Sequence, residues 1–176
     1  EMCIRDRRWV YLGIQKGQVT QDGLTGLNNR RRLDQYMWEL DERSGERETC
    51  CYLLMDVNKF KKVNDTYGHV TGDEVLRLVA EQLKRTFGNM QAFLARYGGD
   101  EFVVIVKGKT QDEMDVIIHQ TQENVNAIAW GADTPWQLSI SIGCAMRGEQ
   151  GKQKSHELLA LADERMYRQK KGIQDR

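Results

Sequence analysis

Runs of apolar residues along the chain predict four strands. Residues 50–55 are continuously apolar, which is typical of a strand buried on both faces of a sheet. Residues 138–144 alternate between apolar and polar side chains, which predicts a strand with one buried face. Residues 93–97 and 102–106 flank Gly98 and Gly99, and we expect a tight hairpin in which both glycines adopt positive φ.

Apolar residues spaced three and four positions apart predict the longer helices. We expect these at about 29–42, 71–87 and 111–129, with a last helix that starts near residue 155. The side chains of Asn29 and Ser155 are suited to cap the first and the last of them. A short helix is expected soon after the strand at 50–55. This order of elements fits an α/β (α+β) sandwich, in which helices flank a central, mostly antiparallel sheet.

The composition indicates a single domain with no overall electrostatic attraction to a charged partner. A chain of 176 residues is long enough for one domain with a real core. Its 26 basic and 26 acidic residues balance, so we expect no nucleic acid partner and no membrane contact. No apolar run approaches the ~20 residues that span a bilayer. The four cysteines match no zinc-binding spacing, and we expect reduced thiols in a cytoplasmic protein.

The first residues differ in character from the rest of the chain. Residues 1–7 read like a translated sequencing adaptor, and we expect them to be an artefact. Residues 8–21 carry apolar positions broken by glycines, which is typical of the end of an input or linker helix. We expect a sensor domain or membrane anchor upstream, the main domain at 22–172 and a tail at 173–176.

Three acidic residues are candidates for metal ligands. Asp100 and Glu101 follow the two hairpin glycines, where adjacent carboxylates repel each other unless a cation lies between them. This favours a hard metal such as Mg²⁺, which binds through oxygen, although a solvated hairpin tip is the alternative. Asp56 follows the buried strand at 50–55, at the kind of sheet edge where ligands gather. The alternative for Asp56 is an N-cap of the next turn.

The stretch 57–73 has the features of a nucleotide site. A strand ends there and a short helix begins, so backbone N–H groups are available to phosphate and Lys61 adds a cation. Asn64 and Asp73 suit guanine, because the carboxylate can accept from N1–H and from the exocyclic amine. Adenine lacks that pair of donors. The alternative is that the lysines only form a solvated face.

Four motifs resemble those of the GGDEF-domain diguanylate cyclases, from about residue 22 to residue 171. Gly98-Gly99-Asp100-Glu101-Phe102 reads as the signature that names the family. Residues 22–31 are similar to D-x-L-T-G-L-x-N-R-R, which we call the linker motif. Residues 56–73 are similar to D-x-D/N-x-F-K-x-x-N-D-x-x-G-H-x-x-G-D, and residues 162–170 to the closing pattern A-D-x-A-M-Y-x-A-K. Asn58 stands where many relatives have Asp, a position not expected to bind metal.

The resemblance implies a ferredoxin-like or palm-type nucleotidyl cyclase core and a set of site residues. It implies catalytic roles for Asp100, Glu101 and Lys61, with the general base more readily Asp100 than Glu101. Mg²⁺, or Mn²⁺ in its place, is expected at Asp56, Val57, Asp100 and Glu101. Guanine is expected at Asn64 and Asp73, and phosphate at Asn58, Lys59, Phe60, Lys61 and Lys170. Gln174 stands where an Arg is often found, so Lys171 is an alternative phosphate contact.

The resemblance also implies an activity in bacterial second-messenger signalling. Such a domain condenses two GTP into cyclic di-GMP and two pyrophosphates, and it acts as a homodimer with the active site between two domains. Many relatives carry an inhibitory Arg-x-x-Asp product site, which Asn89 and Ala92 replace here, so we expect no inhibition through it. The alternative is a GGDEF module that senses GTP or cyclic di-GMP, or binds a partner, without catalysis.

Overall fold

The computed structural model describes residues 20–43, 49–130, 137–147 and 153–174. The expected artefact at 1–7 and nearly all of the expected input helix at 8–21 lie outside the described residues. Within the described ranges, no helix has both the length and the apolar character needed to cross a membrane.

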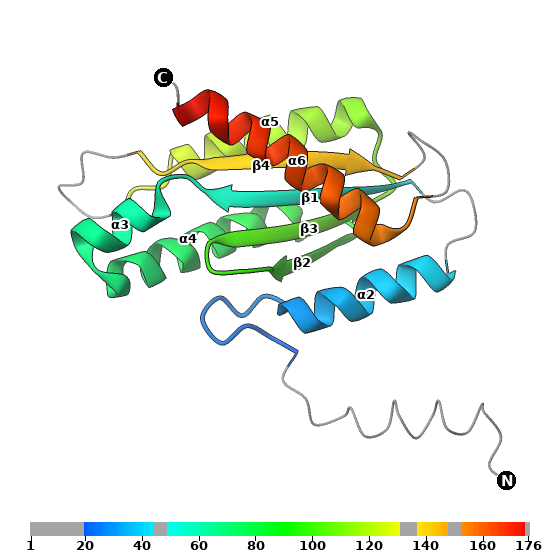
Figure 1. Cartoon of the computed structure of the whole chain (residues 1–176), viewed down its shortest axis with the longest axis horizontal. Helices are drawn as coiled ribbons and strands as arrows, with labels where there is room; N and C mark the ends of the chain where they lie inside the picture. Colours follow the sequence, from blue (N-terminus) through cyan, green and yellow to red (C-terminus); the bar gives the residue numbers. More distant parts are fainter. Residues whose placement is uncertain (1–19, 44–48, 131–136, 148–152, 175–176) are drawn as a thin grey trace, which may run out of the picture.

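A single sheet of four antiparallel strands forms the middle of the molecule (Figure 1). The strands are β1 (Cys50–Val57), β2 (Ala92–Arg96), β3 (Glu101–Lys107) and β4 (Ile140–Met146), in the spatial order β2-β3-β1-β4. Together with two crossovers that contain helices, this order is that of a ferredoxin-like fold. The prediction of an antiparallel sheet flanked by helices is confirmed.

Five helices are present in the described part of the chain, and they follow the predicted order. They are α2 (Arg30–Arg43), α3 (Phe60–Tyr67), α4 (His69–Phe87), α5 (Gln111–Asn126) and α6 (Ser155–Gln174). The Asn29 side chain caps α2 as predicted, since its Oδ1 accepts from the Arg32 N–H at 3.0 Å. The predicted cap by Ser155 is wrong, because Ser155 is the first residue of α6. Its N–H instead donates to both carboxylate oxygens of Asp41 at 3.1 Å.

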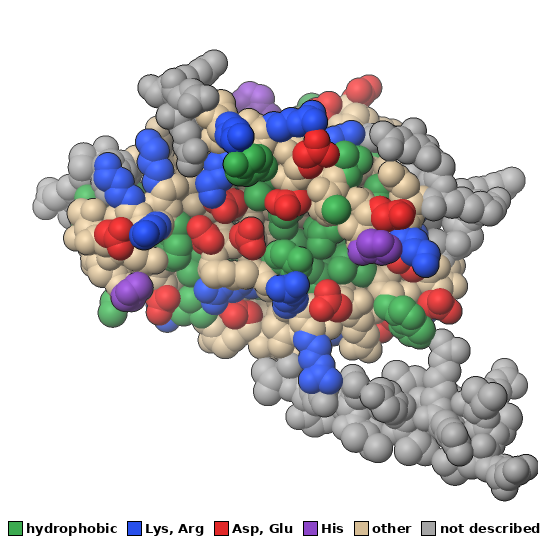
Figure 2. Space-filling model, viewed as in Figure 1, with side chains coloured by type: hydrophobic (Ala, Val, Ile, Leu, Met, Phe, Trp, Pro, Cys, Tyr) green, Lys and Arg blue, Asp and Glu red, His purple; other side chains and the backbone are tan. Residues whose placement is uncertain are grey.

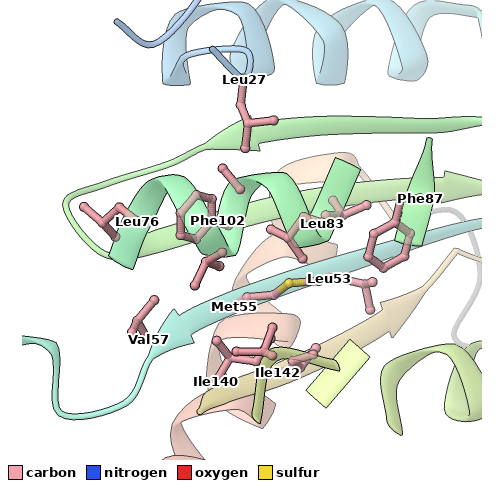
Figure 3. Close-up of a cluster of buried hydrophobic side chains, with 14 of the residues drawn as sticks. Leu27, Leu53, Met55, Val57, Leu76, Leu83, Phe87, Phe102, Ile140 and Ile142 are labelled. Carbon is pink, nitrogen blue, oxygen red and sulfur yellow. The ribbon is translucent and has the colours of Figure 1, made fainter. Parts of the chain in front are cut away.

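The sheet separates two hydrophobic cores. Side chains of β1 alternate between them, so Leu53, Met55 and Val57 face α4, as Figure 3 shows. Tyr52 and Leu54 point to the opposite core, beneath α2 and α6. Because side chains alternate along a strand, β1 brings its penultimate residue to the face that α6 covers.

The signature hairpin departs from the predicted tight turn. Neither Gly98 nor Gly99 adopts positive φ, and the strands are joined by four residues, 97–100. A connection of that length does not need the left-handed conformation of a two-residue turn. A Cβ at Gly98 would lie 2.7 Å from Oε2 of Glu101, so a larger residue there would displace the end of that flexible side chain.

Both edges of the sheet are covered by polar groups. On β4, the Ile142 N–H donates to Oε1 of Gln169 at 2.6 Å, and the Cys144 carbonyl accepts from Nη1 of Arg165 at 2.6 Å. On β2, Asn28 of the linker motif bonds along the strand, accepting from the Arg96 N–H at 2.8 Å. Covered edges prevent further strand pairing.

Candidate active site

Acidic side chains meet at one end of the sheet, on the face covered by α6. Asp56, near the end of β1, is the direct antiparallel partner of Glu101 at the start of β3. The Asp56 residue is only 6% exposed, whereas Glu101 is half-buried. Asp100 is held beside them, because its carbonyl accepts from the Val57 N–H at 3.1 Å. The fold thus brings together the four residues that the sequence predicted for metal binding.

Burial, together with nearby negative charge, raises the pKa of Asp56 and of Glu101. Burial raises the pKa of Asp56, and the charge of Asp100 raises it further. The hydrogen bond from Lys170 lowers it, but by less than burial raises it. Burial also raises the pKa of Glu101, with added repulsion from Asp56, Asp100 and Asp163. The site is therefore short of positive charge and favours a cation.

Lys170 supplies one positive charge to this site. Its Nζ donates to Oδ1 of Asp56 at 2.6 Å, and the Asp56 side chain is 8% exposed. Residue 170 was predicted as a phosphate contact, so the structure joins a predicted phosphate ligand directly to a predicted metal ligand. Lys171, the alternative phosphate contact, is exposed and lies with Nζ 4.7 Å from the centre of the Tyr167 ring.

The donor set suits a hard divalent cation. Among the described residues, no three Asp, Glu, His or Cys side chains converge closely enough to hold a metal on their own. Carboxylates of Asp56 and Asp100, with the Val57 carbonyl, offer oxygen donors that phosphate oxygens of a substrate would complete. Mg²⁺ commonly binds in this way, through few protein ligands and a nucleotide.

Residues that follow β1 shape a candidate phosphate site. Lys59 has a left-handed conformation, with φ of 57° and ψ of 24°, and no side chain caps α3 behind it. First-turn N–H groups, such as those of Phe60 and Lys61, therefore remain for an external anion. The Lys61 side chain is exposed in the same turn.

Asn58 is hydrogen-bonded to β4 and to the residue that precedes it. Its N–H donates to the Ser139 carbonyl at 2.9 Å, its Nδ2 to Oγ of Ser139 at 3.0 Å, and its Oδ1 accepts from Ser141 at 2.7 Å. These bonds fix the direction in which the chain leaves β1.

A candidate base site lies where α3 meets α4. Oδ1 of Asn64 is buried and has no hydrogen-bond partner within the described structure. Gly72 makes room for it, since a Cβ there would lie 1.9 Å from that oxygen. Asp73, the next residue, is exposed. An orphaned buried acceptor beside an open carboxylate fits a ligand that presents N–H donors, as guanine does.

Sequence reasoning missed the residue that anchors the signature turn. Arg96 donates to the carbonyls of Gly98 at 3.1 Å and Gly99 at 2.8 Å, and its Nη1 binds the Asp22 carboxylate at 3.2 Å. Asp22 also accepts from the N–H and the hydroxyl of Thr25, at 2.9 and 2.7 Å. The linker motif is thereby joined to the turn that carries Asp100.

Asp163 was also missed. Its charge acts on Glu101 from α6, seven residues before Lys170. A separation of seven residues places both side chains on one face of α6, and this spacing in the sequence could have identified Asp163 as a site residue. Over the face that carries α6, acidic and basic side chains are interspersed (Figure 2). This agrees with the balanced charges of the sequence, which predict no overall electrostatic attraction to a charged partner.

Comparison with known proteins agrees with the motifs. Residues 19–176 match the family model described as diguanylate cyclase, GGDEF domain. The chain is 33% identical over 167 residues to "Diguanylate cyclase DosC" of Escherichia coli strain K12, covering 91% of this chain and 35% of that protein. It is 38% identical over 156 residues to "Probable diguanylate cyclase DgcI" of the same organism, covering 86% of this chain and 31% of that protein. The chain thus spans about a third of the length of these curated relatives.

Solved structures share the fold over nearly the whole chain. The GGDEF domain of DgcB from Caulobacter crescentus, solved in complex with c-di-GMP, has a TM-score of 0.77 and 30% identity. That match covers 89% of this chain and 93% of the solved chain. The family model, the relatives and the antiparallel sheet agree, and the chain belongs to the GGDEF-domain family of diguanylate cyclases.

Proposed function

We propose that this domain is a diguanylate cyclase that condenses two GTP into cyclic di-GMP and two pyrophosphates. One observation carries the proposal: Asp56, Asp100 and Glu101 lie at the same end of the sheet, where Lys170 bonds Asp56, in a chain with an intact GGDEF signature. The names of the curated relatives support the same activity.

The guanine of each GTP is assigned to the site between α3 and α4. The unpartnered Oδ1 of Asn64 accepts from the exocyclic amine, and Asp73 accepts from N1–H. The triphosphate then lies along the start of α3, near the backbone of Lys59, Phe60 and Lys61. Asn58, which was predicted to touch phosphate, instead receives a positioning role, because its N–H and side chain already bond β4.

Divalent metal is assigned to the acidic cluster. Asp56, Asp100, Glu101 and the Val57 carbonyl hold Mg²⁺, or Mn²⁺ in its place. When bound, the metal neutralises phosphate charge and stabilises the leaving pyrophosphate. Lys61 and Lys170 contribute further positive charge to the triphosphate.

The reaction needs a proton acceptor and two substrates. The 3′-hydroxyl oxygen of one GTP bonds to the α-phosphorus of the other, while the bond from that phosphorus to pyrophosphate breaks. The hydroxyl proton passes to a carboxylate, either Asp100 or Glu101. Burial raises the pKa of Glu101, which favours proton acceptance by this carboxylate, whereas Asp100 is half-buried in the turn before β3.

Two domains are required, because one site holds one GTP and the ring closes only when each nucleotide attacks the other. The proposal therefore includes a homodimer. We also propose that the domain is cytoplasmic and receives its signal from an input domain outside residues 22–172.

Product identification tests this proposal. The protein is incubated with GTP and Mg²⁺, and the nucleotides are separated by chromatography. We expect cyclic di-GMP, and Asp56→Ala and Asp100→Ala are each expected to lower its formation by at least about a hundredfold. Circular dichroism checks that both variants remain folded. GTP binding without any product would favour the sensing alternative.

A further inference from the structure

Helix α6 is fixed on the sheet beside the acidic cluster. Gln169 and Arg165 bond the edge of β4, as described above, on either side of a close packing contact at Gly143. A Cβ at Gly143 would lie 1.8 Å from the Ala162 carbonyl oxygen and 2.4 Å from the Met166 nitrogen. Backbones packed this closely leave no room for the helix to slide. A change of position at this end of α6 would therefore fall to the flexible four-carbon side chain of Lys170.

The ammonium of Lys170 lies beside several acidic side chains at the end of the sheet. It bonds Oδ1 of Asp56 at 2.6 Å, and Asp100 and Asp163 add negative charge around the same end of the sheet. The Lys170 side chain is 28% exposed, so a path from this position to solvent is open.

We infer that Lys170 is the resident counter-ion of the metal site, and that its ammonium leaves Asp56 when a divalent cation binds there. This inference rests on the proposed function for the identity of the cation and of the phosphate. The released ammonium, still attached to the fixed helix, then reaches the phosphate of the bound nucleotide. Lys170 thus neutralises Asp56 until a metal binds, and it contacts the phosphate of the substrate afterwards.

The rival arrangement has Lys170 bonded to Asp56 throughout, bridging it to phosphate with its other N–H donors. The two arrangements predict opposite effects of removing the ammonium. A counter-ion competes with the cation, so its loss tightens metal binding. A permanent bridge holds Asp56 in place, so its loss weakens metal binding or leaves it unchanged.

The affinity for Mn²⁺, measured in the absence of nucleotide, distinguishes the counter-ion from the permanent bridge. The affinity is measured at pH 8 from the electron paramagnetic resonance signal of free Mn²⁺, on the full chain. We expect Lys170→Met to bind Mn²⁺ about tenfold more tightly than the wild type, because a charge-assisted hydrogen bond no longer competes. Unchanged or weaker binding by Lys170→Met, or no measurable binding by either protein, overturns the inference.

Two controls exclude a general effect of charge and locate the site. Lys171→Met removes the neighbouring positive charge and is expected to leave the Mn²⁺ affinity within about twofold of the wild type. A tenfold gain in Lys171→Met as well would attribute the effect to net charge and overturn the inference. Asp56→Asn combined with Lys170→Met is expected to lose the gain, and its persistence would place the cation elsewhere.

This measurement is independent of turnover. If the wild type made no cyclic di-GMP while Lys170→Met still bound Mn²⁺ more tightly, the proposed function would fail and the counter-ion role would stand. A second readout follows the released ammonium: with Mn²⁺ saturating, Lys170→Met is expected to bind a non-hydrolysable GTP analogue about tenfold more weakly. Equal affinity would remove the phosphate contact from the inference.

Discussion

At the scale of single residues, Asp73 determines the choice of base in this account. It is exposed directly after Gly72, beside the buried and unpartnered Oδ1 of Asn64. We expect Asp73→Ser to relax the preference for GTP over ATP by about 1–3 kcal/mol, the usual worth of a good polar contact to a base. Competition binding of GTP and ATP measures this. Glu74→Gln, an exposed neighbour, serves as the control, and an unchanged preference in Asp73→Ser would remove that residue from the base site.

Residue types and spacing predicted the Asn29 cap and singled out the acidic residues that lie together at one end of the sheet, since both depend on local sequence. They did not predict that Lys170 bonds Asp56, because 114 residues separate the two in the chain. The role of Gly98 was misread for a related reason. The two adjacent glycines suggested a tight turn, whereas the connection has four residues and neither glycine adopts positive φ.

At the scale of elements, the contact of α6 with β4 depends on Gly143. Since a Cβ at this position would meet two backbone atoms rather than a flexible side chain, Gly143→Ala forces the helix off the sheet. We expect a loss of about 1–3 kcal/mol in the free energy of unfolding, measured by urea denaturation. Gly172→Ala, on the same helix with nothing within 4 Å of a Cβ, is the matched control. We expect it to change stability by no more than about 1 kcal/mol, in the favourable direction. Equal effects of the two variants would contradict the packing argument.

The linker motif and the signature turn are joined by Asp22 and Arg96. Partial burial opposes ionisation of Asp22, but hydrogen bonds from Thr25 and the charge of Arg96 outweigh it and hold its pKa below the ordinary value of 3.8. A lowered pKa stabilises the fold above that value, and the contribution is lost as pH falls through the folded-state pKa. We expect Asp22→Asn to lower the free energy of unfolding at pH 7 by about 1–2 kcal/mol.

That difference is expected to shrink as the pH is lowered below about 4, where Asp22 of the unfolded chain takes up a proton, and to vanish once the pH is below the folded-state pKa. Urea unfolding at several pH values measures it, with the exposed Asp34→Asn as the control. A difference that stays constant down to pH 2 would mean that the Asp22 charge does not stabilise the turn.

The order and type of the elements could be predicted from the apolar pattern, but the way they are joined could not. Arg165 and Gln169 stand where the closing pattern has alanine, and both bond the outer edge of β4, which pairs with no other strand among the described residues. Identifying those bonds requires the pairing of β4 with β1 and the position of α6 over it. Neither follows from periodicity along one segment.

At the scale of the whole molecule, the expected absence of product inhibition concerns the surface between α4 and β2. A hollow there is lined by Ala92, by other neutral residues and by Lys84. The Lys84 ammonium already bonds the Thr25 carbonyl at 3.1 Å and Glu81 at 2.7 Å. With Asn89 and Ala92 in place of a paired Arg and Asp, the charges that would bind a cyclic dinucleotide are absent from those two positions.

We therefore expect no high-affinity inhibition by cyclic di-GMP through this surface, since losing two charge-assisted contacts costs about 1.5–3 kcal/mol each. Product is titrated into a steady-state assay at two GTP concentrations. Inhibition that weakens as GTP rises is competition at the active site. Strong inhibition that GTP does not relieve would reveal a second product site and contradict the expectation.

The central claim, that two domains each present one GTP to the other, is tested most directly by the dependence of rate on protein concentration. The initial rate of cyclic di-GMP formation is measured at saturating GTP and Mg²⁺ over a dilution series of the protein. The account predicts that the rate per domain rises in proportion to concentration while dimers are scarce, and then levels off. A rate per domain that is constant over a range in which the protein is shown to be monomeric, or GTP binding with no product at any concentration, would contradict it.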